Sequence, residues 1–268
     1  MLSAAPVLAQ TAPEGRSTAD TVVVNAANRN RVLNYVKAAS ALSVDRQVSR
    51  RAGSLCPLVA GAPREVNTYV TARLRQVGEQ VGVEFERKPC QPNLLVLFSR
   101  EPEVMLRQAR DQRKINARFS TPQARRFMSE PRPVRWLNNV GVTAAEGRTA
   151  SASNSIIVSG VDSRLSNPTR SLILGSVIVV DANRTQGVEV GALADYVALT
   201  ALADIKPDAN LAGHRSILNL FSDGQPAASR LTPIDMAYLR GVYKARDTAS
   251  GANQMGKVAT IMAEDLER

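Results

Sequence analysis

Few residues in this chain could do chemistry, and most of them lie between residues 188 and 243. Asp195 interrupts an apolar run, GALADYVALTALADI (residues 191–205), and His214 is the single histidine of the sequence. A carboxylate and an imidazole can together act as general base and acid. A serine or cysteine triad would also need His214 as its base, and no GxSxG motif or phosphate-binding loop is present. One hypothesis is therefore a hydrolase of unknown mechanism that uses Asp195 and His214.

The competing interpretation of both residues is structural. A charge inside a buried helix has to be paired, so Asp195 is expected to bind an arginine or backbone N–H groups. Asp204 lies about two and a half helical turns further along, too far to form a close carboxylate pair with Asp195. His214 is expected to hydrogen-bond to nearby backbone in its loop, because one histidine and one carboxylate bind a metal only weakly. The sequence thus predicts no cofactor and no metal site.

Cys56 and Cys90 are the only cysteines in the chain. In an exported protein such a pair predicts a disulfide, with two free buried thiols as the alternative. The bridge would close a loop of about 35 residues and stabilise the fold by about 3–4 kcal/mol.

Hydrophobic patterns predict an α/β (α+β) fold, a small mixed sheet packed by helices. Apolar positions at helical spacing predict helices over residues 30–42, 63–81, 101–114, 121–128, 191–205, 231–243 and 252–268. Extended segments are expected over residues 50–59, 93–98, 131–139, 155–161 and 172–181, with Gly175 marking a bulge or a turn. Residues 141–154 show no period and are expected to form a mobile loop. The central stretch therefore reads strand, buried helix, tight turn and terminal helix.

The turn and the terminal helix carry the clearest motifs. Their sequences are SILNLF (residues 216–221) and LTPIDMAYLRGVY (residues 231–243). Thr232 is expected to cap the helix, Pro233 to occupy its first turn, and Asp235 to lie favourably near its positive end.

These motifs are similar to SIMNY and LTPxDIxxLRxLY, which follow the zinc-binding helix in metzincin-like peptidases. The order of elements likewise resembles the catalytic half of zincin-type metallopeptidases, which implies a zincin-like fold. On this resemblance Leu218 stands at the turn methionine, Asp195 at the first zinc ligand, Tyr196 at the general base and Leu199 at the second ligand.

The matched positions of this chain lack the residues with which a zinc peptidase binds its metal and activates water. A zincin needs two histidines four residues apart on one helical face, with a glutamate beside the first. Leu199 cannot coordinate a metal, and Tyr196 is a poor base near neutral pH. The chain also looks like uncharacterised exported proteobacterial proteins with LADY and ILNLF segments, a likeness that implies no activity.

The formal net charge of +10 favours acidic partners, such as an anionic membrane surface, a cell-wall polymer or nucleic acid. No nucleic-acid-binding module is recognisable, so we predict no specific nucleic-acid partner. A basic surface without a specific polyanion partner is the main interpretation. The alternative is a protein that binds an anionic envelope polymer in a salt-sensitive manner.

Residues 1–27 are expected to be a signal-peptide remnant and a flexible leader, followed by a single domain over residues 28–268. The residues VLA before Gln10 match the rule for a signal-peptidase site with cleavage after Ala9, and the true start is expected upstream. No run approaches the ~18 apolar residues of a membrane span. These features predict a periplasmic or secreted protein without a transmembrane segment.

The leading hypothesis is a non-catalytic, exported interaction or scaffold protein with a degenerate metallopeptidase-like fold and a protein partner in the cell envelope. Its functional surface is expected on the arginine-rich faces between Arg64 and Arg135, away from residues 188–243.

Overall fold

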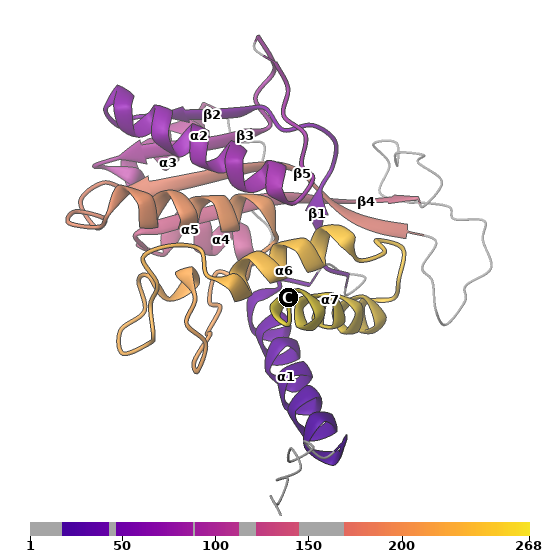
Figure 1. The fold of residues 1–268 in the computed structure, drawn as a ribbon. Helices are drawn as coiled ribbons and strands as arrows, with labels where there is room; N and C mark the ends of the chain where they lie inside the picture. Colours follow the sequence, from indigo (N-terminus) through magenta and orange to yellow (C-terminus); the bar gives the residue numbers. More distant parts are fainter. Residues whose placement is uncertain (1–17, 43–46, 88, 113–121, 145–168) are drawn as a thin grey trace, which may run out of the picture.

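A five-stranded sheet lies at the centre of the fold (Figure 1). The computed structural model describes residues 18–42, 47–87, 89–112, 122–144 and 169–268. The longest strand, β5 (Thr169–Asp181), pairs along its length with the antiparallel strand β4 (Val134–Ala144). The opposite edge of β5 is therefore shared by two short parallel strands, β1 (Arg50–Arg51) and β3 (Leu94–Ser99). Strand β2 (Pro57–Ala60) adds in parallel to β3. This mostly parallel sheet confirms the predicted α/β class.

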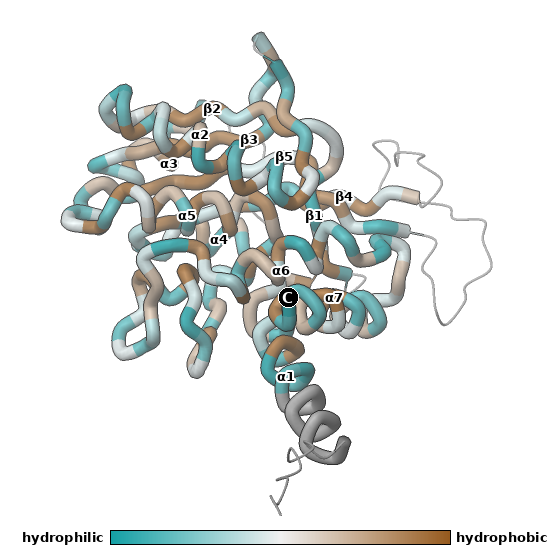
Figure 2. The backbone as a smooth tube through the Cα atoms, in the orientation of Figure 1, coloured by the Kyte–Doolittle hydropathy of each residue, from teal (hydrophilic) through white to brown (hydrophobic). Residues whose placement is uncertain are grey.

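Helices cover both faces of the sheet, because its central strands are apolar on both sides. Ile178 and Val180 of β5 join the main core, whereas Val179, between them, belongs to a second cluster with Leu106 and Phe127. The main core packs against α2 (Arg64–Gln80) and α5 (Val190–Leu202), and the second against α3 (Pro102–Asp111) and α4 (Pro122–Ser129). Apolar residues accordingly concentrate along the strands and the helices beside them (Figure 2).

Helix α5 is the most deeply buried element. Every residue from Gly191 to Leu202 is buried, as predicted from a run that is apolar around the whole helix. Small side chains such as Ala194, Ala198 and Ala201 let neighbouring elements approach it closely. The helix ends at Leu202, three residues before its predicted end at residue 205.

Three further helices pack together beside the sheet. They are α1 (Thr18–Ala39), α6 (Pro233–Lys244) and α7 (Gly251–Leu266), with α7 in contact with both of the others. A short 3-10 helix, η1 (Ile217–Asn219), joins α5 to α6. The predicted order of strand, buried helix, turn and terminal helix is thus confirmed as β5, α5, η1 and α6.

Two predicted boundaries were wrong. Helix α1 begins at Thr18, inside the stretch of residues 1–27 where the sequence predicts a signal-peptide remnant and a flexible leader. Strand β4 runs to Ala144, so residues 141–144 are not loop, because they pair with the start of β5. The remaining loop prediction, the predicted strand at residues 155–161 and the signal-peptidase site lie outside the described residues.

The irregularity predicted at Gly175 is a β-bulge. Asn139 pairs with Gly175, but the next residue of β4, Val140, pairs with Ile173. Leu174 therefore has no partner of its own, and β5 continues through this point as one strand.

Cys56 and Cys90 form the predicted disulfide, with their Cα atoms 6.1 Å apart. The bridge ties the residue before β2 to the segment that leads into β3, and α2 lies in the loop that it closes. No helix in the described part of the chain is long and apolar enough to cross a membrane.

Replacing Cys56 and Cys90 together by Ala is expected to lower the free energy of unfolding by about 3–4 kcal/mol, because the unfolded chain regains the freedom of the open loop. Urea titrations followed by circular dichroism measure this change. Dithiothreitol should destabilise the unmodified protein by a similar amount and leave the variant unaffected. A variant as stable as the unmodified protein would contradict a stabilising role for the bridge.

Candidate functional site

Asp195 is the one carboxylate at the predicted catalytic positions of α5, and both of its oxygens are hydrogen-bonded within the fold. Its side chain is fully buried, and both carboxylate oxygens accept hydrogen bonds from the guanidinium of Arg73 on α2. The backbone N–H of Leu231 donates to Oδ2 at 2.8 Å. Asp195 therefore joins α2, α5 and the segment before α6, which confirms the structural interpretation of this residue.

Tyr196 of α5 lies near Leu218 of η1. The Tyr196 ring packs edge-on against Trp136 and Phe221, with ring centroids 6.1 and 5.1 Å apart. Tyr196 and Leu218 line one cavity of about 310 Å³. Burial raises the pKa of Tyr196 well above its ordinary value, so its hydroxyl stays protonated at neutral pH. The other residue of the predicted set, Leu199, is fully buried in the core.

His214 has a different environment from the predicted one. Its ring meets the ring of Tyr35 edge-on at 5.5 Å, and its buried Nδ1 has no hydrogen-bond partner in the described part of the chain. The expectation that its side chain bonds to nearby backbone was therefore wrong. Burial, together with the positive charge of Arg31, lowers the pKa of His214, which favours a neutral imidazole. His214 and Asp195 thus have separate sets of partners.

Asp235 is a second fully buried carboxylate, and the sequence indicated only part of its role. Thr232 caps the helix as predicted, and Asp235 completes a capping box by accepting the Thr232 backbone N–H on Oδ2 at 2.9 Å. The Ile217 N–H also donates to Oδ2, at 2.9 Å. The hydroxyls of Tyr35 and Ser216 donate to Oδ1 at 2.7 and 2.6 Å. Asp235 therefore holds α1, η1 and α6 together through neutral donors.

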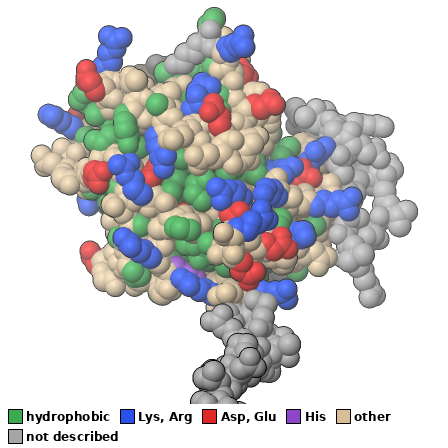
Figure 3. Space-filling view, viewed as in Figure 1, with side chains coloured by type: hydrophobic (Ala, Val, Ile, Leu, Met, Phe, Trp, Pro, Cys, Tyr) green, Lys and Arg blue, Asp and Glu red, His purple; other side chains and the backbone are tan. Residues whose placement is uncertain are grey.

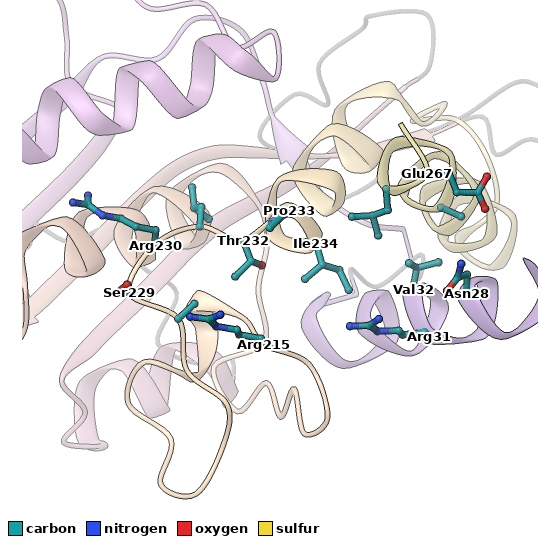
Figure 4. Close-up of a pocket in the computed structure, with 14 residues that line it drawn as sticks. Asn28, Arg31, Val32, Arg215, Ser229, Arg230, Thr232, Pro233, Ile234 and Glu267 are labelled. Carbon is teal, nitrogen blue, oxygen red and sulfur yellow. The ribbon is translucent and has the colours of Figure 1, made fainter. Parts of the chain in front are cut away.

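A pocket of about 560 Å³ opens at the N-terminal end of α6 (Figure 4). Its polar lining is rich in arginine, with Arg31 from α1, Arg215 from the segment before η1, and Arg230 from the segment before α6. Apolar side chains such as Val32 and Ile234 also line it. Sequence reasoning missed this pocket because its arginines come from separate segments, and no motif places them together.

The three arginines of the pocket differ in their partners. Arg230 donates to the Tyr69 hydroxyl at 3.0 Å and to Glu189 at 3.1 Å. Arg31 and Arg215 are exposed and have no ion pair or hydrogen bond within the described residues. One carboxylate, that of Glu267 at the end of α7, also lines the pocket. The pocket therefore carries an excess of positive charge.

The arginine-rich faces between Arg64 and Arg135 offer less free charge than their composition suggests. Carboxylates lie within ion-pair distance of Arg73, Arg75, Arg110, Arg126, Arg132 and Arg135. Arg64, Arg87, Arg100 and Arg107 are exposed and form no ion pair within the described residues. The face that carries α2, α5, α6 and α7 shows basic side chains interspersed with acidic ones (Figure 3).

A scan against protein-family models and searches of curated proteins and of solved structures returned no match to this chain. Among the described residues, no group of three or more His, Cys, Asp and Glu side chains is placed to hold a metal ion. The functional argument therefore depends on the geometry of the side chains themselves.

Asp204, just after α5, has a side-chain carboxyl group whose pKa is raised. Burial raises its pKa to about 6, although the Asn138 amide, which donates to Oδ1 at 2.8 Å, and the charge of Arg51 both act to lower it. The folded protein therefore binds this proton more tightly than the unfolded chain does.

Asp195→Ala is expected to lower the free energy of unfolding by about 3 kcal/mol, because Arg73 and the Leu231 N–H lose their buried acceptor. Asp111→Ala is the matched control, since its carboxylate is 65% exposed and pairs only with neighbouring Arg110. The control should change stability by less than about 0.5 kcal/mol. Urea denaturation compares the two variants, and equally small losses would show that the buried pair contributes little.

The contribution of Asp204 to stability should be greatest below its unfolded pKa of 3.8 and be lost as the pH rises through about 6. Between these values, ionising the buried carboxyl costs the folded state at most about 3 kcal/mol. Asp204→Asn retains an acceptor for Asn138 and should remove this part of the pH dependence. Urea titrations from pH 4 to 7 measure it, and identical slopes for both proteins would refute the assignment.

Proposed function

We propose that this protein is a non-catalytic interaction or scaffold protein, exported to the periplasm or beyond. The observation that carries this proposal is the engagement of Asp195. A carboxylate that accepts bonds from Arg73 and the Leu231 N–H has no free oxygen directed at a substrate or a metal. The residue best suited for catalysis by its type and position instead holds the fold together.

The remaining positions of the predicted catalytic set support the same proposal. The zinc that a zincin-like framework implies does not fit them, since Leu199 is a buried hydrocarbon and Tyr196 is a buried, protonated phenol packed between rings. Leu218 lies in a turn between α5 and α6, as the resemblance to metzincin-like sequences implies, and fills space beside Tyr196. We therefore infer a metallopeptidase-like framework that serves packing.

The proposal of export has support from the Cys56–Cys90 disulfide. Structural disulfides persist mainly in oxidising compartments such as the bacterial periplasm, and they are rare in the cytosol. The predicted signal-peptidase site near Ala9 agrees with the same location. A protein partner in the cell envelope is then the expected ligand of such a scaffold.

The rival hypothesis, a hydrolase that uses Asp195 and His214, requires the two side chains to cooperate. Asp195 pairs with Arg73, whereas His214 contacts Tyr35 and has its pKa lowered by burial and by the charge of Arg31. Their described contacts therefore favour separate structural roles.

The purified, oxidised protein is expected to contain no stoichiometric zinc and to cleave no peptide or ester substrate, while capturing a defined partner from envelope extract. Metal analysis, hydrolysis assays with and without added zinc, and affinity capture with mass spectrometry test this. His214→Ala is the informative variant for the rival hypothesis. Hydrolysis by the unmodified protein that His214→Ala abolishes would establish the hydrolase and end the scaffold proposal.

A further inference from the structure

We infer that the pocket at the N-terminal end of α6 binds the phosphoryl group of a small or lipid ligand. This inference deepens the proposed binding function and rests on it, because it gives the chemical class of one ligand. The pocket in question is the one lined by Arg31, Arg215 and Arg230 (Figure 4).

Unpaired positive charge is the first observation that points to an anion. Arg31 and Arg215 reach the same pocket from α1 and from the segment before η1, and within the described residues neither has a carboxylate partner. Exposed arginines without an ion pair, such as Arg64 and Arg107, also occur elsewhere on the described surface, but neither of these two lines the pocket. Because both side chains line the pocket, their positive charges would both attract an anion bound there.

The chemistry of the guanidinium group favours a phosphoryl oxyanion. Arginine presents a planar set of donors that matches phosphate oxygens in bidentate geometry, and it stays charged at any physiological pH. Two unpaired guanidinium groups match the double charge of a phosphate monoester. Arg230 is half-exposed and already shared with Tyr69 and Glu189, so it would contribute a third, weaker contact.

Helix α6 does not itself supply the anion donors. The Thr232 N–H donates to Asp235, Pro233 has no N–H, and the Asp235 N–H donates to the Thr232 hydroxyl. The Thr232 and Asp235 N–H groups are thus already engaged within the capping box. Selectivity for an anion therefore comes from the arginine side chains, which single substitutions can remove.

The rest of the lining limits the size and shape of the ligand. A volume of about 560 Å³ fits a small molecule or one lipid headgroup. Val32, Ile234 and Ala263 provide apolar contact beside the charged side chains. Glu267 lines the same pocket and opposes ligands with further negative charge. A compact phosphoryl group attached to a short apolar portion satisfies these constraints.

Inorganic phosphate is the primary probe, added to the full-length protein at constant ionic strength with chloride as the reference anion. Isothermal titration should give saturable binding of phosphate, and the Arg31→Gln/Arg215→Gln double variant should bind at least about tenfold more weakly, because it loses two charge-assisted contacts. The matched control is Arg64→Gln/Arg107→Gln, which removes the same charge from exposed arginines elsewhere. The control should bind phosphate within about twofold of the unmodified protein.

Glu267→Gln provides a test in the opposite direction. Removing this carboxylate from the lining should tighten phosphate binding by about two- to fivefold, because a like charge is removed from the site. Circular dichroism and urea titration establish that all variants are folded. A Glu267→Gln variant that binds phosphate more weakly than the unmodified protein would count against the assignment.

Vesicles identify the source of the phosphoryl group. Co-sedimentation with phosphatidic acid/phosphatidylcholine vesicles that Arg31→Gln/Arg215→Gln abolishes would indicate a lipid headgroup. Phosphate binding without vesicle binding would indicate a soluble ligand. Both results support the site. Absence of phosphate binding, or equal binding by the unmodified protein and the double variant, would overturn it. Neither result would disturb the proposed scaffold function, which fails only if the protein proves to be catalytic or captures no partner.

Discussion

Two buried carboxylates hold the segment before α6 against the rest of the molecule. Asp195 accepts the N–H of Leu231, and Asp235 accepts the N–H of the next residue, Thr232. Both side chains are completely buried, where an unpaired charge would cost several kcal/mol, so each persists only because donors surround it. Two successive N–H groups are therefore held by hydrogen bonds. Asp195 joins that of Leu231 to α5, and Asp235 joins that of Thr232 to α1 and η1.

The two carboxylates achieve this by different means. Asp195 is neutralised by a cation, Arg73, which is only partly covered. Asp235 has no cation among its partners and depends on hydroxyl and backbone N–H groups and on the positive end of α6. The first arrangement joins two helices that cover the sheet, and the second attaches the α1, α6 and α7 group to the turn η1. The same two carboxylates therefore stabilise the fold and position part of the pocket, because Leu231 and Thr232, which they bind, also line the pocket.

Local features of the fold were predictable from the sequence, and long-range partners were not. The α2 stripe, the all-round apolar α5, the Thr232 capping box and the bulge at Gly175 each depend on residues within a few positions of one another. The early start of α1 had no apolar period to reveal it, and the end of β4 depends on pairing with β5. For the site, burial and pairing of Asp195 followed from its apolar neighbours. Its actual partner, Arg73, is 122 residues away, and Tyr35 is 200 residues from Asp235, so neither could be named in advance.

The disulfide has a consequence for how these charges become buried. Cys56 and Cys90 close a loop that contains the whole of α2, and α2 carries Arg73. A closed loop can fold its helix onto β2 and β3 with less loss of chain entropy than an open one. The folded loop thereby holds Arg73 beside Asp195 of α5. The cross-link and the buried ion pair therefore act on the same helix, because the bridge lowers the entropy cost of placing Arg73 and the pair with Asp195 holds α2 against α5.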